Sequence, residues 1–328
     1  MKVLFIGGTG NISGAVSRLC IAQGIELWHL NRGQRPIDIP GVKSLVADIN
    51  DPVAVKSALG NQTFDVVVNF IAFTAADIAR DEALFAGRCG QYIFIGTASS
   101  YQKPLAHPIV TESTPLKNPY WDYSHKKIEA EEALNRAYRE RDFPMVIVRP
   151  SLTYDTVIPV AVGGWGCFTW VDRVRRGLPV ICHGDGTNLW TVTHSEDFGR
   201  GLIGLFGNPQ TLGHAFHITS DELLTWEQIY RQIGAAAGAE PKLVFIPSDF
   251  IGKVIPWKDG CLRGDKAHSA IFDNTKIKTF VPGFRAEIPF RVGIARTIRW
   301  FEADPRRLRI DPDVNARHEQ ILSAWGKR

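Results

Sequence analysis

The first fourteen residues constrain the fold of this chain more than any other segment. Residues 2–6 form a short run, Lys-Val-Leu-Phe-Ile, whose continuous apolar character is typical of a buried parallel strand. Gly7, Gly8 and Gly10 follow immediately, and glycine adopts backbone angles that other residues avoid. Apolar residues then recur at helical spacing over 15–20. The segment predicts a strand, a tight glycine turn and a helix, in that order.

The helix after this turn is expected to begin near Ser13 or Gly14. The backbone N–H groups of a first helical turn have no partner inside the helix and lie at the positive end of its dipole, so they suit a pyrophosphate. Gly7 and Gly10 keep the spacing of the dinucleotide-binding fingerprint, while Ser13 stands at the place of its third glycine. Ser13 is small enough to let the helix pack on the strand, and it can also cap the helix.

Composition and charge narrow the class of protein. A length of 328 residues suggests about two domains, and 45% hydrophobic with 22% charged residues is typical of a soluble globular protein. A net charge of +4 is too small to indicate a nucleic-acid partner. The five cysteines include no C-x-x-C pair, which argues against a zinc site or a disulfide framework. With no signal-peptide core and no membrane-spanning run, we expect a cytoplasmic protein without a metal.

Strand-like and helix-like runs alternate through residues 1–153, which predicts an α/β fold, a Rossmann-type doubly wound parallel sheet that binds NAD(P). Further strands are expected at 25–30, 44–47, 65–69, 92–96 and 145–149, and helices from 52, around 75–89 and over 122–141.

The remainder, residues 154–328, is rich in glycine, proline and tryptophan at its start and is expected to form mainly a smaller substrate-binding lobe. It includes expected elements at 214–218 (strand), 225–238 (helix) and 242–246 (strand). Elements near 190–218 are expected to return to the first domain.

Tyr123 and Lys127 lie four residues apart within the expected long helix, and therefore on one face of it. A free phenol, with a pKa of about 10, is a poor base at neutral pH. A lysine cation beside it favours the phenolate, which makes proton exchange with a substrate hydroxyl or carbonyl feasible. An isolated pair at this spacing is usually only a surface pair. Its place after the fifth strand of a dinucleotide-binding domain favours the chemical interpretation.

Hydroxyl side chains follow that fifth strand directly, at Thr97, Ser99 and Ser100. A hydroxyl at the carboxyl end of a strand can hydrogen-bond the reacting oxygen and hold it against the phenol. Turn formation is the alternative role for these residues.

Together these features resemble the short-chain dehydrogenase/reductase superfamily, in its extended branch of NAD(P)-dependent epimerases and dehydratases. The resemblance covers residues 1 to about 235. It rests on Gly7, Gly10, Asp48, residues 97–101 and 112–116, Tyr123, Lys127, Arg149-Pro150, and residues 183–186 and 194–198.

The resemblance implies roles for individual residues. Tyr123 would be the catalytic acid/base, Lys127 its activator and a ribose ligand, and Thr97 the catalytic hydroxyl. Thr97 is preferred over Ser99 because it lies four residues before Tyr101, the spacing that the family uses. The implied cofactor contacts are Gly7, Thr9, Gly10, Asn11, Ile12, Asn31, Arg32, Asp48, Ile49, Phe70, Ala72, Tyr123, Lys127 and Pro150.

Two departures from the family pattern bear on the substrate. Dehydratases of this branch carry acidic residues just after the catalytic threonine, whereas Ala98 and Ser99 stand there, which disfavours dehydration. Enzymes acting on nucleotide sugars place an arginine where this chain has Trp190. An uncharged side chain cannot neutralise a diphosphate, so a nucleotide-diphosphate sugar is disfavoured.

A third departure bears on the cofactor. The second strand is expected to end in Leu30-Asn31-Arg32, without the acidic residue that binds the 2′-hydroxyl of NAD. Arg32, with Arg35, can pair with the 2′-phosphate of NADP instead. NADP is therefore favoured over NAD, although Arg32 can equally stack on the adenine or point to solvent.

Aromatic side chains are frequent in the loops that should border the substrate pocket. Such faces suit sugars as well as aromatic or alicyclic rings. Together with Ser99, the expected substrate contacts are Phe73, Tyr101, Trp121, Tyr154, Trp165 and Trp190, and Phe168 belongs to the same group of loop aromatics.

We therefore expect an NAD(P)(H)-dependent oxidoreductase acting on a secondary alcohol or ketone of a small polyhydroxylated or cyclic substrate. A sugar epimerase with retained cofactor needs the same residues and stays open. A fold-retaining RNA-binding or regulatory module, known in this superfamily, is the non-enzymatic alternative. The helices at 75–89 and 122–141 are expected to form a homodimer face, as in relatives.

Overall fold

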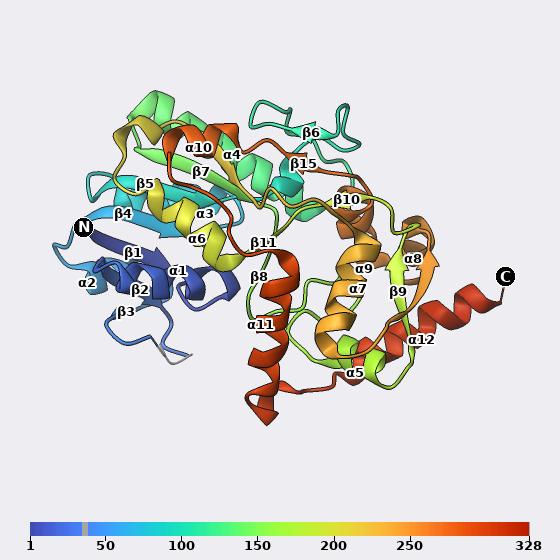
Figure 1. The fold of residues 1–328 in the computed structure, drawn as a ribbon. Coiled ribbons are helices and arrows are strands. Elements are labelled where there is room, and N and C mark those ends of the chain that lie inside the picture. The colour runs from blue at the N-terminus through green and yellow to red at the C-terminus, as the bar shows by residue number, and fades with distance from the viewer. Residues whose placement is uncertain (35–38, 328) are drawn as a thin grey trace.

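A computed structural model describes residues 1–34 and 39–327 of the chain. At its centre is a seven-stranded sheet in the order β12-β7-β5-β4-β1-β2-β3, with parallel pairing along its length (Figure 1). The strand order reverses between β1 and β4, the point at which open α/β sheets bind ligands. The expected doubly wound Rossmann-type fold is confirmed. Arg35 lies outside the described residues.

The strands of the sheet are β1 Lys2–Ile6, β2 Glu26–Asn31, β3 Lys43–Val46, β4 Phe64–Asn69, β5 Cys89–Ile95, β7 Met145–Pro150 and β12 Ala215–Ile218. The shorter strands are β6 Ile109–Val110, β8 Leu152–Tyr154, β9 Pro179–His183, β10 Leu189–Trp190, β11 Val192–His194, β13 Leu224–Thr225, β14 Lys242–Ile246 and β15 Ile271–Phe272. The helices are α1 Asn11–Ala22, α2 Pro52–Leu59, α3 Ala75–Phe85, α4 Asp122–Arg141, α5 Thr169–Arg175, α6 Ser195–Gly204, α7 Trp226–Ala237, α8 Ser248–Val254, α9 Pro256–Cys261, α10 Thr275–Phe280, α11 Phe290–Glu302 and α12 Pro312–Gly326.

Helices cover both faces of the sheet, which explains why its strands are apolar throughout. In β1, Leu4 and Ile6 pack with α2, α3 and α4 on one face, while Val3 and Phe5 pack with α1 and α6 on the other. All four side chains are fully buried. Side chains alternate between the faces of a strand, so a continuous apolar run supplies both layers of the core.

Two expected helix boundaries are wrong. Helix α1 begins at Asn11 rather than near Ser13, because Gly10 takes the extended capping conformation. The Ser13 hydroxyl braces the turn from inside the helix, accepting the Gly10 N–H at 2.8 Å. Helix α3 ends at Phe85 rather than near residue 89, because the chain turns at Gly87, whose φ is +70°. Strand β5 then starts at once.

The second half of the chain builds a separate apolar cluster around Trp170, Trp226 and Tyr230. Helix α7 begins after the capping side chain of Thr225 and ends before Gly238, as its sequence predicts. Strand β12 nevertheless pairs with β7 in the main sheet, and α6 packs against α1. Late residues of the chain therefore complete the early layers.

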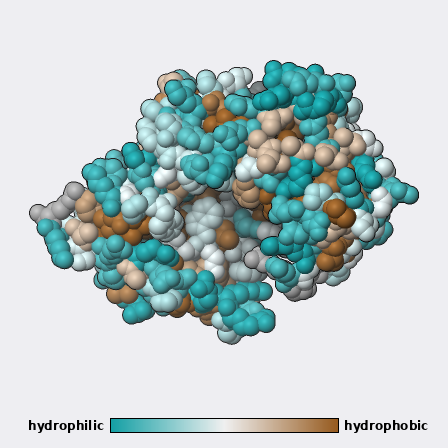
Figure 2. All heavy atoms as spheres, turned by 180° about the vertical axis from the view of Figure 1, so that it is seen from behind, coloured by the Kyte–Doolittle hydropathy of each residue, from teal (hydrophilic) through white to brown (hydrophobic). Residues whose placement is uncertain are grey.

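The reverse face of the molecule is hollowed near its middle, between the two halves of the chain (Figure 2). Among the described residues no group of three His, Cys, Asp or Glu side chains is arranged to hold a metal ion. None of the helices in residues 1–34 and 39–327 is long and apolar enough to span a bilayer.

Candidate active site

The turn between β1 and α1 needs glycine for reasons of space. Gly7 has a φ of +83°, and a Cβ there would lie 2.5 Å from Cγ2 of Ile71. A Cβ on Gly8 would lie 2.4 Å from the ring of His29. The Ser13 hydroxyl donates to the Gly7 carbonyl at 2.9 Å, so it joins the turn to the helix. The turn is thus rigid, and its backbone is open to a ligand.

A cavity of about 470 Å³ opens beside this turn. The first helical hydrogen bond of α1 joins the Gly14 N–H to the Gly10 carbonyl, which leaves the N–H groups of residues 11–13 without a partner in the helix. These residues fit the pyrophosphate of a dinucleotide, with space for adenosine between the ends of β2 and β3. Of the expected cofactor contacts, the cavity is lined by Gly7, Thr9, Gly10, Asn31, Arg32, Asp48 and Ile49.

Not every expected cofactor contact faces this cavity. The Asn11 amide donates to the Thr153 carbonyl at 3.3 Å and accepts the Thr156 N–H at 3.2 Å, so it ties α1 to β8 and to the loop that follows it. Ile12 and Pro150 line a second cavity.

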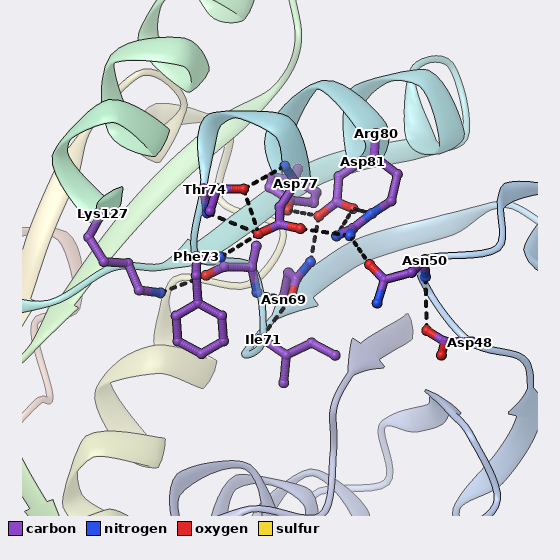
Figure 3. Close-up of polar contacts among 12 residues, drawn as sticks. Asp48, Asn50, Asn69, Ile71, Phe73, Thr74, Asp77, Arg80, Asp81 and Lys127 are labelled. Carbon is purple, nitrogen blue, oxygen red and sulfur yellow. Dashed lines mark hydrogen bonds and ion pairs between the residues drawn. The ribbon is translucent and has the colours of Figure 1, made fainter. Parts of the chain in front are cut away.

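A polar network holds the loop after β4, at residues 70–74 (Figure 3). Asn69 accepts the N–H groups of Ile71 and Ala72 at 2.8 and 2.9 Å. Asp77 accepts the N–H groups of Phe73 and Thr74, both at 2.9 Å. The sequence analysis missed this network, although Thr74 and Asp77 have the spacing of a capping box.

Two further members of the network are anchored in the core. Asp81 is fully buried and accepts hydrogen bonds from the Asn69 amide and the Tyr92 hydroxyl, both at 2.5 Å. Arg80 joins Asp81 to Asp77, with N–O distances of 2.8 Å to both carboxylates. Burial raises the pKa of Asp81, and the Arg80 cation opposes that shift. The loop is therefore fastened to α3 and β5 rather than free to move.

This loop meets Lys127, which reaches across from α4. Its ammonium donates to the carbonyls of Ala72 and Ile95 at 2.7 and 2.8 Å, and it lies 4.5 Å from the ring centroid of Phe73 (Figure 3). Burial lowers the pKa of Lys127 to about 7. The two carbonyls orient the ammonium at the ends of β4 and β5, and Lys127, which is 2% exposed, lines neither the first nor the second cavity.

Tyr123 lies next to Lys127, but its electrostatics differ from the expectation. Burial raises the pKa of Tyr123, and a hydrogen bond with Thr97 opposes that shift. The Lys127 ammonium is 5.9 Å from the centroid of the Tyr123 ring and is directed at the two backbone carbonyls. The expected lowering of the phenol pKa by this cation is therefore absent. The phenol stays protonated at neutral pH.

Tyr123 opens on a second cavity of about 360 Å³. Three hydroxyls form a chain at its wall: the Ser99 oxygen lies 3.0 Å from that of Thr97 and 2.8 Å from that of Ser124. Thr97 and Tyr123, the catalytic residues expected from the sequence, both line this cavity.

The expected substrate contacts divide into two groups. Ser99, Trp121, Trp165 and Trp190 line the second cavity. Phe73 lines neither cavity; it is 43% exposed and packs near Tyr123, with ring centroids 6.1 Å apart.

Tyr101, Tyr154 and Phe168 do not line either cavity, which corrects the expectation for them. The Tyr101 hydroxyl lies beneath the site, 3.3 Å from a guanidinium nitrogen of Arg149 and 3.2 Å from Nδ1 of His217. Tyr154 is fully buried against aromatic rings of the second half, and Phe168 belongs to the same apolar cluster. Their sequence position beside site loops says nothing of the direction in which they point.

Three charged residues of the second cavity were missed: Lys103, Asp265 and Lys266. Lys103 lies in the loop between β5 and β6, and the other two lie in the π-helix Leu262–Lys266. No local motif marks them, and more than 150 residues separate the two segments.

Comparison with known proteins agrees with this geometry. A model of the NAD dependent epimerase/dehydratase family matches residues 3–218. The 2′-dehydrokanamycin reductase of Streptomyces kanamyceticus is 25% identical over 253 residues, which is 76% of this chain and 70% of the relative. The chloroplast stem-loop binding protein of 41 kDa b of Arabidopsis thaliana is 26% identical over 281 residues, covering 79% and 70% of the two chains.

Among solved structures, UDP-glucose 4-epimerase from Bifidobacterium longum in complex with NAD+ and UDP has a TM-score of 0.74. The match is 16% identical and covers 94% of this chain and all of that one. The family match spans about two thirds of the chain, from β1 to β12, and includes both cavities' principal loops. The chain therefore belongs to the NAD dependent epimerase/dehydratase family of enzymes, in the extended branch of the short-chain dehydrogenase/reductase superfamily.

Proposed function

We propose that this enzyme transfers hydride between a nicotinamide dinucleotide and a secondary alcohol or ketone of a small polyhydroxylated or cyclic substrate. The observation that carries the proposal is the position of Tyr123. Its half-buried phenol lines the same cavity as Thr97, at the carboxyl end of the sheet that also bears the glycine turn. The reductase of Streptomyces kanamyceticus, a relative at 25% identity, supports an oxidoreductase.

The chain's own residues would hold the dinucleotide in three places. The glycine turn and the N–H groups at the start of α1 would take the pyrophosphate. Asp48 and Ile49 would contact the adenine, and Lys127 would hold the nicotinamide ribose. When bound, the nicotinamide supplies or accepts the hydride.

Tyr123 would move the proton. Because its pKa is raised, the phenol is protonated at neutral pH and is suited to act as a general acid toward a carbonyl oxygen. Thr97 would hold that oxygen against the phenol by a second hydrogen bond. The direction that this state favours is reduction of a ketone: the carbon gains the hydride while Tyr123 gives its proton to the oxygen.

Arg32 supports NADP(H) as the preferred cofactor. It follows β2 directly, is exposed, and lines the adenosine end of the first cavity. The end of β2, at Leu30 and Asn31, carries no carboxylate that would repel a 2′-phosphate. A guanidinium at this place can make charge-assisted hydrogen bonds to that phosphate.

A sugar epimerase with retained cofactor is the alternative that the fold match favours. Against a nucleotide-sugar substrate stands Trp190, which is 2% exposed and stacks on Trp226 with ring centroids 5.4 Å apart. That place in the cavity therefore offers no cation to a diphosphate. The similarity to the chloroplast stem-loop binding protein keeps RNA binding as a non-enzymatic alternative.

One assay separates these functions. The protein is incubated with NADPH and a panel of cyclic and polyhydroxylated ketones, and absorbance at the nicotinamide band is followed. A reductase consumes NADPH in proportion to product. An epimerase interconverts stereoisomers with no net change in absorbance. Salt-sensitive RNA retention without dinucleotide turnover would instead favour the binding module.

A further inference from the structure

The second cavity carries a group of charges that the proposed proton and hydride transfers do not use. Lys103, Asp265 and Lys266 line its wall together with Tyr123. They come from two segments far apart in the sequence. The fold therefore brings two cations and one carboxylate to the place where the substrate is expected to bind.

Lys103 is the least compensated of these charges. Its side chain is buried, with the residue only 4% exposed. Within residues 1–34 and 39–327, its ammonium has neither a hydrogen-bond acceptor nor an ion-pair partner, although its backbone N–H is paired with the Lys117 carbonyl. Burial lowers the pKa of this lysine. The ammonium nitrogen is not among the fully buried unpartnered atoms of the described residues, so it meets the open space of the cavity, where a ligand can reach it. Titratable groups with such a shifted pKa are typical of binding sites.

Lys266 completes the positive charge. It is 6% exposed, and its ammonium lies 3.0 Å from a carboxylate oxygen of Asp265. An ammonium has three donors, so this ion pair leaves others for a ligand. Asp265 can neutralise only one of the two lysines. The cavity thus keeps a net positive charge.

The walls around the cations suit a small organic molecule. The Lys266 ammonium lies 5.8 Å from the ring of Trp121 and 6.0 Å from that of Trp165. Asp265 is close enough to act on the pKa of both Tyr123 and Lys103. The cations and the phenol therefore face the same cavity.

We propose that Lys103 and Lys266 bind an anionic oxygen group of the substrate, a carboxylate or a phosphate, while Tyr123 faces its carbonyl or hydroxyl carbon. This proposal rests on the proposed function, because it places the anion in the cavity of the proposed acid/base. The substrate class is then a small hydroxy or oxo acid, or a sugar acid or sugar phosphate. The anion is bound by lysines from two separate segments rather than by the residue at position 190.

The test is calorimetric titration of the protein saturated with NADPH, so that the pyrophosphate site is occupied. The probes are inorganic phosphate and D-glucuronate, with D-glucose as the neutral counterpart of glucuronate, all at one ionic strength. We expect at least one anion to bind and glucose to bind more weakly. Lys103→Met should lower the affinity for the anion about tenfold or more, which is the effect of losing a charge-assisted hydrogen bond. Lys103→Arg should retain binding.

Lys126→Met is the matched control, because Lys126 lies on α4 in an exposed ion pair with Asp122 and does not line the cavity. It should bind the anions as the wild type does. Thermal unfolding checks that Lys103→Met folds, and Lys266→Met provides a second variant. The proposal would be overturned if neither anion binds the wild type. It would also be overturned if Lys103→Met and Lys266→Met bind the anions as tightly as the wild type does. NADPH is titrated into the protein before the anions are added. If NADPH itself does not bind, the result counts against the proposed function instead.

Discussion

Tyr123 has a lysine beside it, and yet the pKa of its phenol is raised rather than lowered. The phenol is half-buried beside Trp121 and Phe73, and this burial raises its pKa, while the neighbouring ammonium of Lys127 donates to backbone carbonyls. The phenol is thus poised as an acid in the ligand-free protein. A positive nicotinamide ring nearby would favour the phenolate, because an opposite charge stabilises the ionised form.

The first prediction is that Tyr123→Phe loses a factor of about 100 to 10,000 in turnover, the range for a general acid or base. Dinucleotide affinity should change little, because the variant keeps the ring and removes only the hydroxyl. Turnover is measured from NADPH absorbance and affinity from NADPH fluorescence. Tyr120→Phe is the control, since Tyr120 is exposed and outside both cavities. Unchanged turnover in Tyr123→Phe would remove this residue from the mechanism.

The second prediction concerns Arg32. Arg32→Ala should weaken NADPH about tenfold or more while NADH changes much less, because only NADPH carries the 2′-phosphate. Dissociation constants for both cofactors check this. Lys43→Ala, which removes an exposed cation on the neighbouring strand β3, should affect both cofactors little. An equal loss for both would show that Arg32 contacts a part that they share.

Residue-level prediction from the sequence worked where position along an element determines direction. Lys127 is one helical turn from Tyr123, and the two do share a face. Thr97 directly follows β5, so its hydroxyl reaches the carboxyl edge of the sheet. For Tyr101 and Tyr154 the sequence predicts only nearness in the chain. Their rings turn into the core because partners there, Arg149 and Phe290, come from distant segments.

At the scale of elements, the loop after β4 shows how a helix start can position a site. The capping side chains of α3 also hold the loop backbone whose Ala72 carbonyl orients Lys127. Asp77 in addition raises the pKa of Lys127 through its charge, although burial has the larger, opposite effect. The Asp77 carboxylate therefore both stabilises α3 and holds the loop that orients the Lys127 ammonium.

The third prediction follows from this shared role. Asp77→Ala should lower the free energy of unfolding by about 1 kcal/mol, as loss of a capping interaction does, and should also weaken dinucleotide binding about threefold or more. Gln228→Ala removes the corresponding N3 side chain of the capping box of α7, which accepts the Thr225 N–H far from this loop. It should cost similar stability without the binding defect. Equal cofactor affinity in the two variants would contradict the role of Asp77 in holding the loop after β4.

Element boundaries were predictable where a side chain marks them. Asp51 and Pro52 begin α2 as expected, with the Asp51 carboxylate accepting two backbone N–H groups. The start of α1 was displaced because Gly10, which has no side chain to signal a cap, performs that function by its backbone conformation.

At the scale of the whole molecule, the sequence predicted the sheet and the place of the site, but not the full wall of the substrate cavity. Hydrophobic periodicity specifies strands and helices locally. The approach of Lys266 to Lys103 depends instead on how the second half of the chain folds over the sheet. Nothing in either segment's own pattern encodes that approach.

A whole-molecule property does follow from burial, namely acid sensitivity. His29, His183 and His318 are 0–1% exposed, and burial lowers the pKa of each to about 4. Unfolding returns each imidazole to its ordinary pKa of about 6.5. The unfolded chain therefore binds more protons as the pH falls, and the stability present above pH of about 6.5 is progressively lost toward pH of about 4.

The fourth prediction is that each of these histidines costs about 2 kcal/mol of stability at pH 5 relative to pH 7.5. Urea unfolding at the two pH values measures the loss. His29→Phe keeps a ring stacked near Phe5 but cannot take up a proton, so it should reduce the difference between the two pH values by that amount. His125→Phe, an exposed position on α4, should leave the difference unchanged. The same pH dependence in His29→Phe and the wild type would mean that His29 takes up its proton without unfolding. Acid loss of the fold would then have to come from other groups, such as the two histidines outside the main sheet.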